Sequence, residues 1–117
     1  QVSLTMPGSE GLAAIAAMMK RVRSALPTQL GAYTVRETVD LAAASDSGLP
    51  PSNVLIFRLD GGHRVIMRPS GTEPKLKSHY EVRVVIGAGE TIAAATARGR
   101  AELATLRDAH QALLKQQ

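Results

Sequence analysis

The 117-residue sequence lacks cysteine and tryptophan altogether, and it contains only one phenylalanine and two tyrosines. Without cysteine, disulfides and thiolate metal sites are excluded. The scarcity of aromatic side chains argues against a nucleic-acid-binding module that stacks bases on aromatic platforms. No apolar run reaches the roughly 18 residues of a transmembrane helix, and the first residues do not resemble a secretory signal. We therefore expect a cytoplasmic protein with no membrane partner and no nucleic-acid partner.

What is present is typical of a folded domain. Hydrophobic residues make up 44% of the chain and charged residues 21%, which are ordinary values for globular proteins. The length suits one domain, residues 1–117, with a modest core. The net charge is +4 at pH 7. Between positions 64 and 83 the basic residues outnumber the acidic ones: Arg64, Arg68, Lys75, Lys77 and Arg83 stand against Glu73 and Glu81.

The first half of the chain predicts a strand, a helix and a second strand. Residues 2–4 alternate as a short strand, and Ser9 is a suitable N-cap for the helix that follows. The expected buried stripe of this helix recurs at steps of three and four residues: Leu12, Ile15, Ala16, Met19, Val22 and Leu26. From Tyr33 to Leu41 the period becomes two, with the odd-numbered side chains expected on one face. Residues 42–53 predict a surface loop.

The second half predicts three strands and a helix. Strands at 54–59 and 64–68 are joined by Asp60-Gly61-Gly62-His63, a hairpin signal, and a further strand is expected over 76–86. The last helix begins at about Glu90, with this expected buried stripe: Ile92, Ala95, Gly99, Leu103, Leu106, Ala109 and Leu113. Short connections favour antiparallel pairing. We predict an α+β fold, a mainly antiparallel sheet with two helices on one face.

Residues 68–77 read RPSGTEPKLK and hold more hydrogen-bond donors than a turn requires. Arg68 has a planar fork of donors, and Ser70 and Thr72 have hydroxyls. Gly71 allows the backbone to approach a ligand closely, while the two prolines stiffen both ends of the loop. Convergent donors and positive charge favour a phosphate-binding loop. Lys77 on the next strand is a further candidate ligand, and Lys75 another.

A plain connection is the alternative, in which serine and threonine bond their own backbone and Arg68 is a surface charge. From the residues alone both interpretations stay open. His79 is expected to be a solvated side chain beside Lys77, and Glu73 to orient Lys75 or the loop backbone. No cluster of acids or histidines suggests a metal site or a catalytic group in this chain.

The stretch RPSGTEPKLK, preceded by RVIM and followed by SHYEVRVVI, resembles the signature of the C-terminal domain of the α-D-phosphohexomutases, which include phosphoglucomutases and phosphomannomutases. The resemblance implies a fold like that of the TATA-box-binding protein, with the order β-α-β-β-β-β-α. It also implies that the domain binds the non-reacting phosphate of a phosphorylated hexose, through Arg68, Ser70, Gly71 and Thr72, with Lys75 and Lys77 nearby.

The same resemblance implies a parent enzyme that moves a phosphoryl group between the 1- and 6-positions of a hexose. Its other domains would hold the phosphoserine and the Mg²⁺ site, and this fourth domain would close over the cleft. We therefore expect no cofactor here and no activity of the isolated chain. Phosphopentomutase, phosphoglucosamine mutase and a non-enzymatic anion- or nucleic-acid-binding module are the alternatives.

Overall fold

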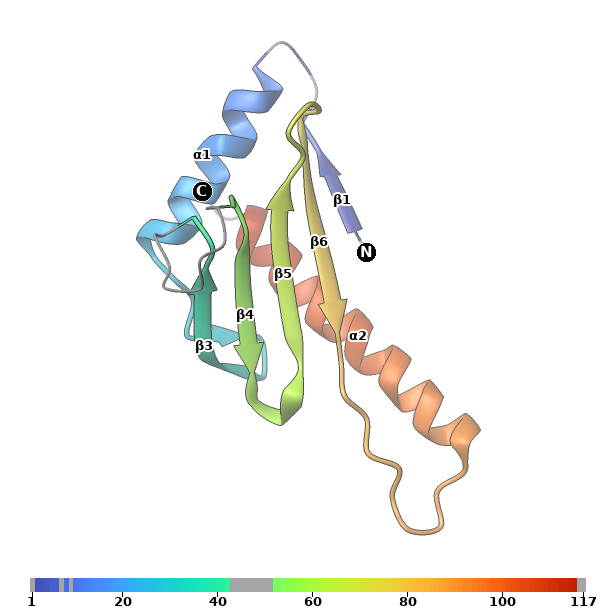
Figure 1. The fold of residues 1–117 in the computed structure, drawn as a ribbon. Coiled ribbons are helices and arrows are strands. Elements are labelled where there is room, and N and C mark those ends of the chain that lie inside the picture. Colours follow the sequence, from blue (N-terminus) through green and yellow to red (C-terminus); the bar gives the residue numbers. More distant parts are fainter. Residues whose placement is uncertain (1, 7, 9, 43–51, 116–117) are drawn as a thin grey trace.

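Six strands form one antiparallel sheet in the computed structural model, which describes residues 2–6, 8, 10–42 and 52–115. The strands are β1 (Val2–Thr5), β2 (Gln29–Leu30), β3 (Tyr33–Asp40), β4 (Leu55–Leu59), β5 (Arg64–Pro69) and β6 (Lys75–Glu81). They lie in the order β1-β6-β5-β4-β3-β2. The helices α1 (Gly11–Ser24) and α2 (Ile92–Lys115) both pack behind this sheet (Figure 1). The α+β class and the predicted order of elements are confirmed, with β2 as an additional strand.

The core lies between the helices and one face of the sheet. Alternate residues of β4, β5 and β6 point inward because successive side chains of a strand face opposite sides. The fully buried residues among them are Leu55, Phe57, Val65, Met67, Leu76 and Ser78. Ile15, Met18, Met19 and Val22 of α1 and Leu106 and Leu114 of α2 close this layer from the other side. Neither α1 nor α2, the α-helices of the described residues, packs on the opposite face of the sheet, which leaves that face open to a ligand or another domain (Figure 1).

The predicted stripe of α1 is only partly right. Ile15, Met19 and Val22 are buried, but Leu12 and Leu26 are 54% and 46% exposed, and Ala16 is exposed as well. The buried stripe instead begins at Gly11, where an added Cβ would collide with the Met6 carbonyl oxygen and lie 2.6 Å from Pro74 Cβ. Met18, seven residues after Gly11 and so on the same helix face, is buried as well. Ser9 lies outside the described residues.

Helix α2 begins at Ile92, not Glu90, because Thr91 Oγ1 accepts a hydrogen bond from the Ala94 amide and so caps the first turn. Ile92 was predicted to be buried but is 75% exposed. The predicted Ala95, Gly99 and Leu106 are buried. The rest of the buried stripe is His110 and Leu114, while Leu103, Ala109 and Leu113 are only partly buried.

The strand predicted over 76–86 ends at Glu81. Glu81 is paired with Arg64, the first residue of β5, so β5 has no residue left to pair with residues 82–86. These residues continue as an extended segment toward α2 (Figure 1). The short β2 was not predicted at all: its two residues pair with Tyr33 and Thr34 at the far edge of the sheet.

A register shift between Val35 and Glu37 corrects the predicted faces of β3. Before it, Val35 is opposite the buried Leu59; after it, Thr38 and Asp40 are opposite Phe57 and Leu55, which are buried. A β-bulge changes which side chains face the core. As a result Asp40 turns toward α1, where its carboxylate accepts hydrogen bonds from the Arg23 guanidinium at 3.0 and 3.3 Å. Odd-numbered residues therefore do not share one face throughout.

The hairpin between β4 and β5 is confirmed. Residues Asp60–Gly62 form a tight turn in which Gly61 and Gly62 have φ of 86° and 83°, values that residues with side chains rarely adopt. The predicted surface loop lies mostly outside the described residues, since it includes 43–51.

Candidate functional site

The helix-free face of the sheet presents the odd-numbered side chains of β6 and the even-numbered side chains of β5. The ladder places Arg68 directly opposite Lys77, Ile66 opposite His79, and Arg64 opposite Glu81. These three rungs differ in chemistry: the first has two cations, the second an aliphatic side chain beside a histidine, and the third an ion pair. Cationic and apolar groups thus lie next to one another on a surface that neither α1 nor α2 covers.

Arg68 and Lys77 form the cationic rung. Like charges directly opposite one another in an antiparallel pair destabilise a sheet. In the part of the chain that the structure describes, neither residue pairs with a carboxylate (salt bridges are formed by other residues). A cationic pair kept together without an acid is therefore a feature that folding alone does not favour. An anion bound between the two side chains would remove the repulsion.

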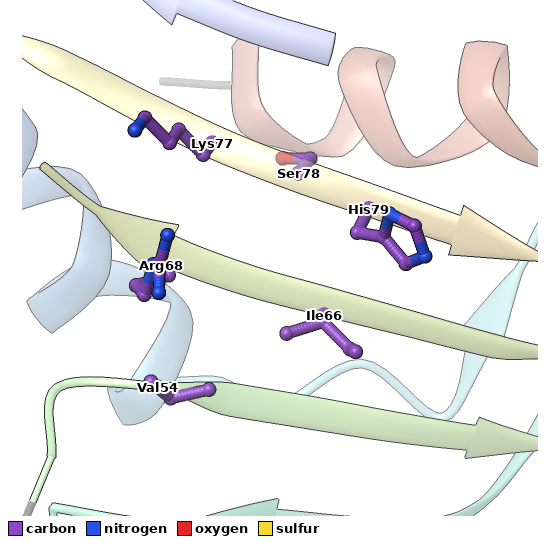
Figure 2. Close-up of a pocket in the computed structure, with 6 residues that line it drawn as sticks. All are labelled: Val54, Ile66, Arg68, Lys77, Ser78 and His79. Carbon is purple, nitrogen blue, oxygen red and sulfur yellow. The ribbon is translucent and has the colours of Figure 1, made fainter. Parts of the chain in front are cut away.

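A hollow of about 350 Å³ lies against this pair, between the strands β4, β5 and β6. We call it the basic hollow; its lining residues are Val54, Ile66, Arg68, Lys77, Ser78 and His79. Figure 2 shows Arg68 and Lys77 on neighbouring strands at one end, with Ile66 and His79 further along the same two strands. The floor is aliphatic and the cations line one end, which suits a small ligand with an anionic group.

The loop 70–74 joins β5 to β6 at the end of the same hairpin. Ser70 Oγ accepts hydrogen bonds from the amides of Thr72 and Glu73, at 3.4 and 3.2 Å. The Ser70 amide donates to the Lys75 carbonyl oxygen at 2.9 Å. The serine thus bonds its own loop, as the plain-connection interpretation expects. Its hydroxyl proton remains available, and two donors on the oxygen make that proton a better donor.

Gly71 and Thr72 are exposed in this loop. A Cβ at Gly71 would meet nothing within 4 Å, and its φ is not among the positive ones. Neither packing nor backbone conformation therefore requires glycine here, in contrast to Gly11. Room for a ligand close to the backbone remains as a reason for it. The structure does not bring Ser70, Gly71 or Thr72 into the lining of the basic hollow; they lie at the adjoining turn.

Lys75 pairs with Glu73, whose Oε2 lies 3.2 Å from the lysine Nζ. This contact confirms the expectation that Glu73 orients Lys75. It also neutralises Lys75, so Lys77 is the freer of the two predicted lysines. The expectation that His79 is solvated is confirmed as well: its side chain is 49% exposed, with Nε2 at 3.5 Å from a Glu81 oxygen.

The far end of the open face is charged in a different way. Arg64 lies 2.5 Å from Glu81, and Arg58 lies 3.0 Å from Glu37, so each arginine has its own carboxylate. The hydrogen bond from Arg64 lowers the pKa of Glu81 below its ordinary value, which keeps that acid ionised. These arginines have structural partners, whereas Arg68 at the other end of β5 has none among the described residues.

Two histidines have structural surroundings. His63 is buried, and its Nδ1 accepts a hydrogen bond from the Arg83 amide at 3.0 Å. His110 is fully buried on α2, with its Nδ1 2.6 Å from the Tyr80 hydroxyl. Burial lowers the pKa of His110 from 6.5 to about 4. Among the described residues, no three His, Asp or Glu side chains come together as a metal site would require.

The sequence did not single out Val54 and Ile66, which form the aliphatic part of the hollow. A usable signal existed for Ile66, because alternation along β5 places it on the same face as Arg64 and Arg68. Val54 precedes β4, and the register of the β4–β5 hairpin, which pairs Leu55 with Met67, brings it near Arg68. No helix in the described part of the chain combines the length and apolar character of a membrane span.

Known proteins resemble this chain over part of its length. It is 33% identical over 72 residues to a probable phosphomannomutase of Haemophilus influenzae, a match that covers 62% of this chain and 14% of the relative. It is 34% identical over 90 residues to phosphoglucomutases of two Staphylococcus epidermidis strains, covering 68% of this chain and 16% of each relative. No family profile and no solved structure matches the chain.

The chain therefore spans less than one fifth of the length of these curated relatives. The relatives are named as mutases of two different hexose phosphates, the two activities that the resemblance of the RPSGTEPKLK stretch implies. The α+β architecture agrees with the same resemblance. On these grounds the chain is a domain of the phosphohexomutase family.

Proposed function

We propose that this domain holds the phosphate group of a phosphorylated hexose in a larger phosphoglucomutase or phosphomannomutase. The observation that carries the proposal is the cross-strand pair Arg68 and Lys77, two cations that face an open hollow without an acid among the described residues. The guanidinium can grip two phosphate oxygens at once, and the ammonium adds a point charge. Ser70, Gly71 and Thr72 contribute donors from the adjoining loop.

Within the parent enzyme the domain has a positioning role. Phosphoryl transfer depends on positioning and on electrostatic stabilisation. The reaction moves a phosphoryl group between the 1- and 6-positions of the sugar. The phosphate that does not react would be held by Arg68, Lys77 and residues 70–72, which we call the phosphate cradle, and this contact orients the sugar. Closure of the domain over the cleft excludes water. Because either phosphate fits the same cradle, a bisphosphorylated intermediate could be bound in both orientations.

The proposal places the chemical step and the metal elsewhere in the parent. Ser70 Oγ is engaged with two amides of its own loop and belongs to the cradle rather than acting as a nucleophile. The phosphoserine and the Mg²⁺ site are proposed to lie in the other domains of this cytoplasmic enzyme. The isolated chain should therefore bind sugar phosphate without converting it. Turnover of glucose 1-phosphate by the 117-residue chain alone would contradict this part of the proposal.

An NMR titration of the ¹⁵N-labelled chain tests the binding role. Glucose 6-phosphate is expected to shift the amides of residues 68–77 selectively, with a dissociation constant in the micromolar to millimolar range. Unphosphorylated glucose is the matched ligand control and should cause no shift there. Short duplex DNA is the second control, because a nucleic-acid module would bind it more tightly than the sugar phosphate. Tight DNA binding at physiological salt, with no response to glucose 6-phosphate, would favour that alternative.

A further inference from the structure

The edge of β6 that faces β1 is only half covered. The β1–β6 ladder begins at Val2, which is opposite Ser78, so β1 covers only the first part of β6 on this side. Residues 79–81 of β6 and the extended segment 82–86 continue past that point (Figure 1). In an antiparallel strand the N–H and C=O of one residue point to the same side, and successive residues alternate. The direction of each backbone group can therefore be assigned.

Hydrogen bonds on both sides fix this assignment. The Lys75 carbonyl accepts from the Ser70 amide, and the Arg83 amide donates to His63, so odd-numbered residues point toward β5. The Pro74 carbonyl accepts from the Met6 amide, so even-numbered residues point toward β1. The backbone groups of Tyr80, Val82 and Val84 consequently face the uncovered edge. No hydrogen bond between described residues engages the backbone of Val82 or Val84.

Two hollows lie beside this edge, between it and α2. One, of about 270 Å³, is lined by Val2, Tyr80, Arg100 and Arg107 among others. The other, of about 350 Å³, is lined by Val82, Val84, Ile86 and Ile92. Arg100 and Leu103 line both, so the two hollows adjoin; we call them together the edge groove. Val2, the first residue of β1, lines the end of the groove nearest β1, so the groove begins where the β1–β6 ladder ends.

The edge groove combines two features that would bind an extended strand, an apolar lining and unpaired backbone groups. Its apolar lining would take the inward-pointing side chains of such a strand, and the unpaired backbone groups would pair with its backbone. Arg100, which has no carboxylate partner among the described residues, would attract an acidic side chain. A strand that continues β1 in register would set the residue directly before Gln1 opposite Tyr80, and residues two and four positions further upstream opposite Val82 and Val84.

We propose that the polypeptide directly upstream of Gln1 in the parent mutase extends β1 along this edge and fills the edge groove. The inference rests on the proposed function, which makes this chain the C-terminal part of a longer enzyme. The extended strand has apolar side chains at its inward positions and at least one carboxylate facing Arg100. This pairing fixes the orientation of the domain relative to the polypeptide that precedes it. It thereby fixes how the basic hollow is oriented toward the rest of the enzyme.

Amide hydrogen exchange tests the proposal on the parent enzyme and on the 117-residue chain. Amides of Val82 and Val84 should exchange at least about tenfold more slowly in the parent, because hydrogen-bonded amides exchange only on opening. The amide of Arg83 points the other way, to His63, and should be protected equally in both. Equal exchange of Val82 and Val84 in the two proteins would overturn the proposal. So would protection in the short chain that rises with protein concentration, because a second copy would then cover the edge.

A pair of proline variants provides a second readout. V84P removes an N–H that faces the groove, whereas V85P removes one that faces the opposite side. We expect V84P to restore fast exchange at Val82 in the parent, and V85P to leave that amide protected. Protection that survives V84P would contradict the predicted pairing. Glucose 6-phosphate binding, measured on the same samples through residues 68–77, reports separately on the proposed function, so a failure of the strand pairing can be distinguished from a failure of the phosphate-binding role.

Discussion

Replacing Arg68 by alanine tests whether this arginine binds a ligand or stabilises the fold. A ligand-binding role predicts weaker phosphate binding with unchanged stability, whereas a structural role predicts lower stability. Arg68 has no carboxylate among the described residues and is directly opposite Lys77. A hydrogen bond to a charged group is worth about 1.5–3 kcal/mol. Loss of one such bond to phosphate therefore predicts a dissociation constant for glucose 6-phosphate that is roughly 10 to 150 times higher.

The same substitution should not weaken the fold. Removing one of two opposed cations relieves a repulsion of about 0.2–1 kcal/mol, so the free energy of unfolding should stay equal or rise slightly. The gain should shrink in high salt, which screens exposed charges. Stability is measured by urea unfolding and binding by NMR titration, both on the 117-residue chain.

Arg58→Ala is the matched control. Arg58 is on the same open face but pairs with Glu37 at 3.0 Å, so its loss should cost between 0 and about 1 kcal/mol of stability and leave binding within roughly twofold. The reasoning is refuted if R68A binds glucose 6-phosphate as well as the original chain. It is refuted equally if R68A loses more than about 1 kcal/mol of stability, because Arg68 would then be a structural residue.

Three further predictions concern the loop and the core. Gly71→Ala should leave the free energy of unfolding within about 0.5 kcal/mol of the original value but weaken phosphate binding. Gly11→Ala should lower the free energy of unfolding by about 1–3 kcal/mol, because the added methyl group clashes with Met6 and Pro74. Equal effects of the two substitutions on unfolding would contradict the structure. Glu73→Gln should release Lys75 and tighten binding at low salt by a few fold, and weaker binding would show that the acid supports the cradle. Burial lowers the pKa of His110 to about 4, so between pH 6.5 and 4 the unfolded chain binds a proton that the folded chain does not. The free energy of unfolding should therefore fall by about 3 kcal/mol as the pH falls from 6.5 to 4. His110→Gln should flatten that part of the profile in urea titrations, and an unchanged slope would exclude His110 as its cause.

Local patterns in the sequence were sufficient for the type and order of the elements. Period-two runs and a glycine hairpin predicted β4 and β5 almost to the residue, because strand alternation and positive φ are properties of a few neighbouring residues. The cluster Arg68, Ser70, Gly71 and Thr72 was also visible, since its chemistry is contained in one short segment. These features need no knowledge of which strands become neighbours.

Contacts between distant segments decided the rest. Residues 82–86 alternate as a strand would, yet β6 ends at Glu81 because β5 has no residue left to pair with them. Gly11 is buried by Met6 and Pro74, and the bulge in β3 turns Asp40 toward Arg23, neither of which a periodic pattern contains. The sheet register set Arg68 opposite Lys77 and brought Val54 into the same hollow. Side-chain chemistry and local backbone preference are properties of individual residues and their sequence neighbours. Strand length, burial and the groups that surround a charged side chain depend instead on which distant segments become neighbours in the folded structure.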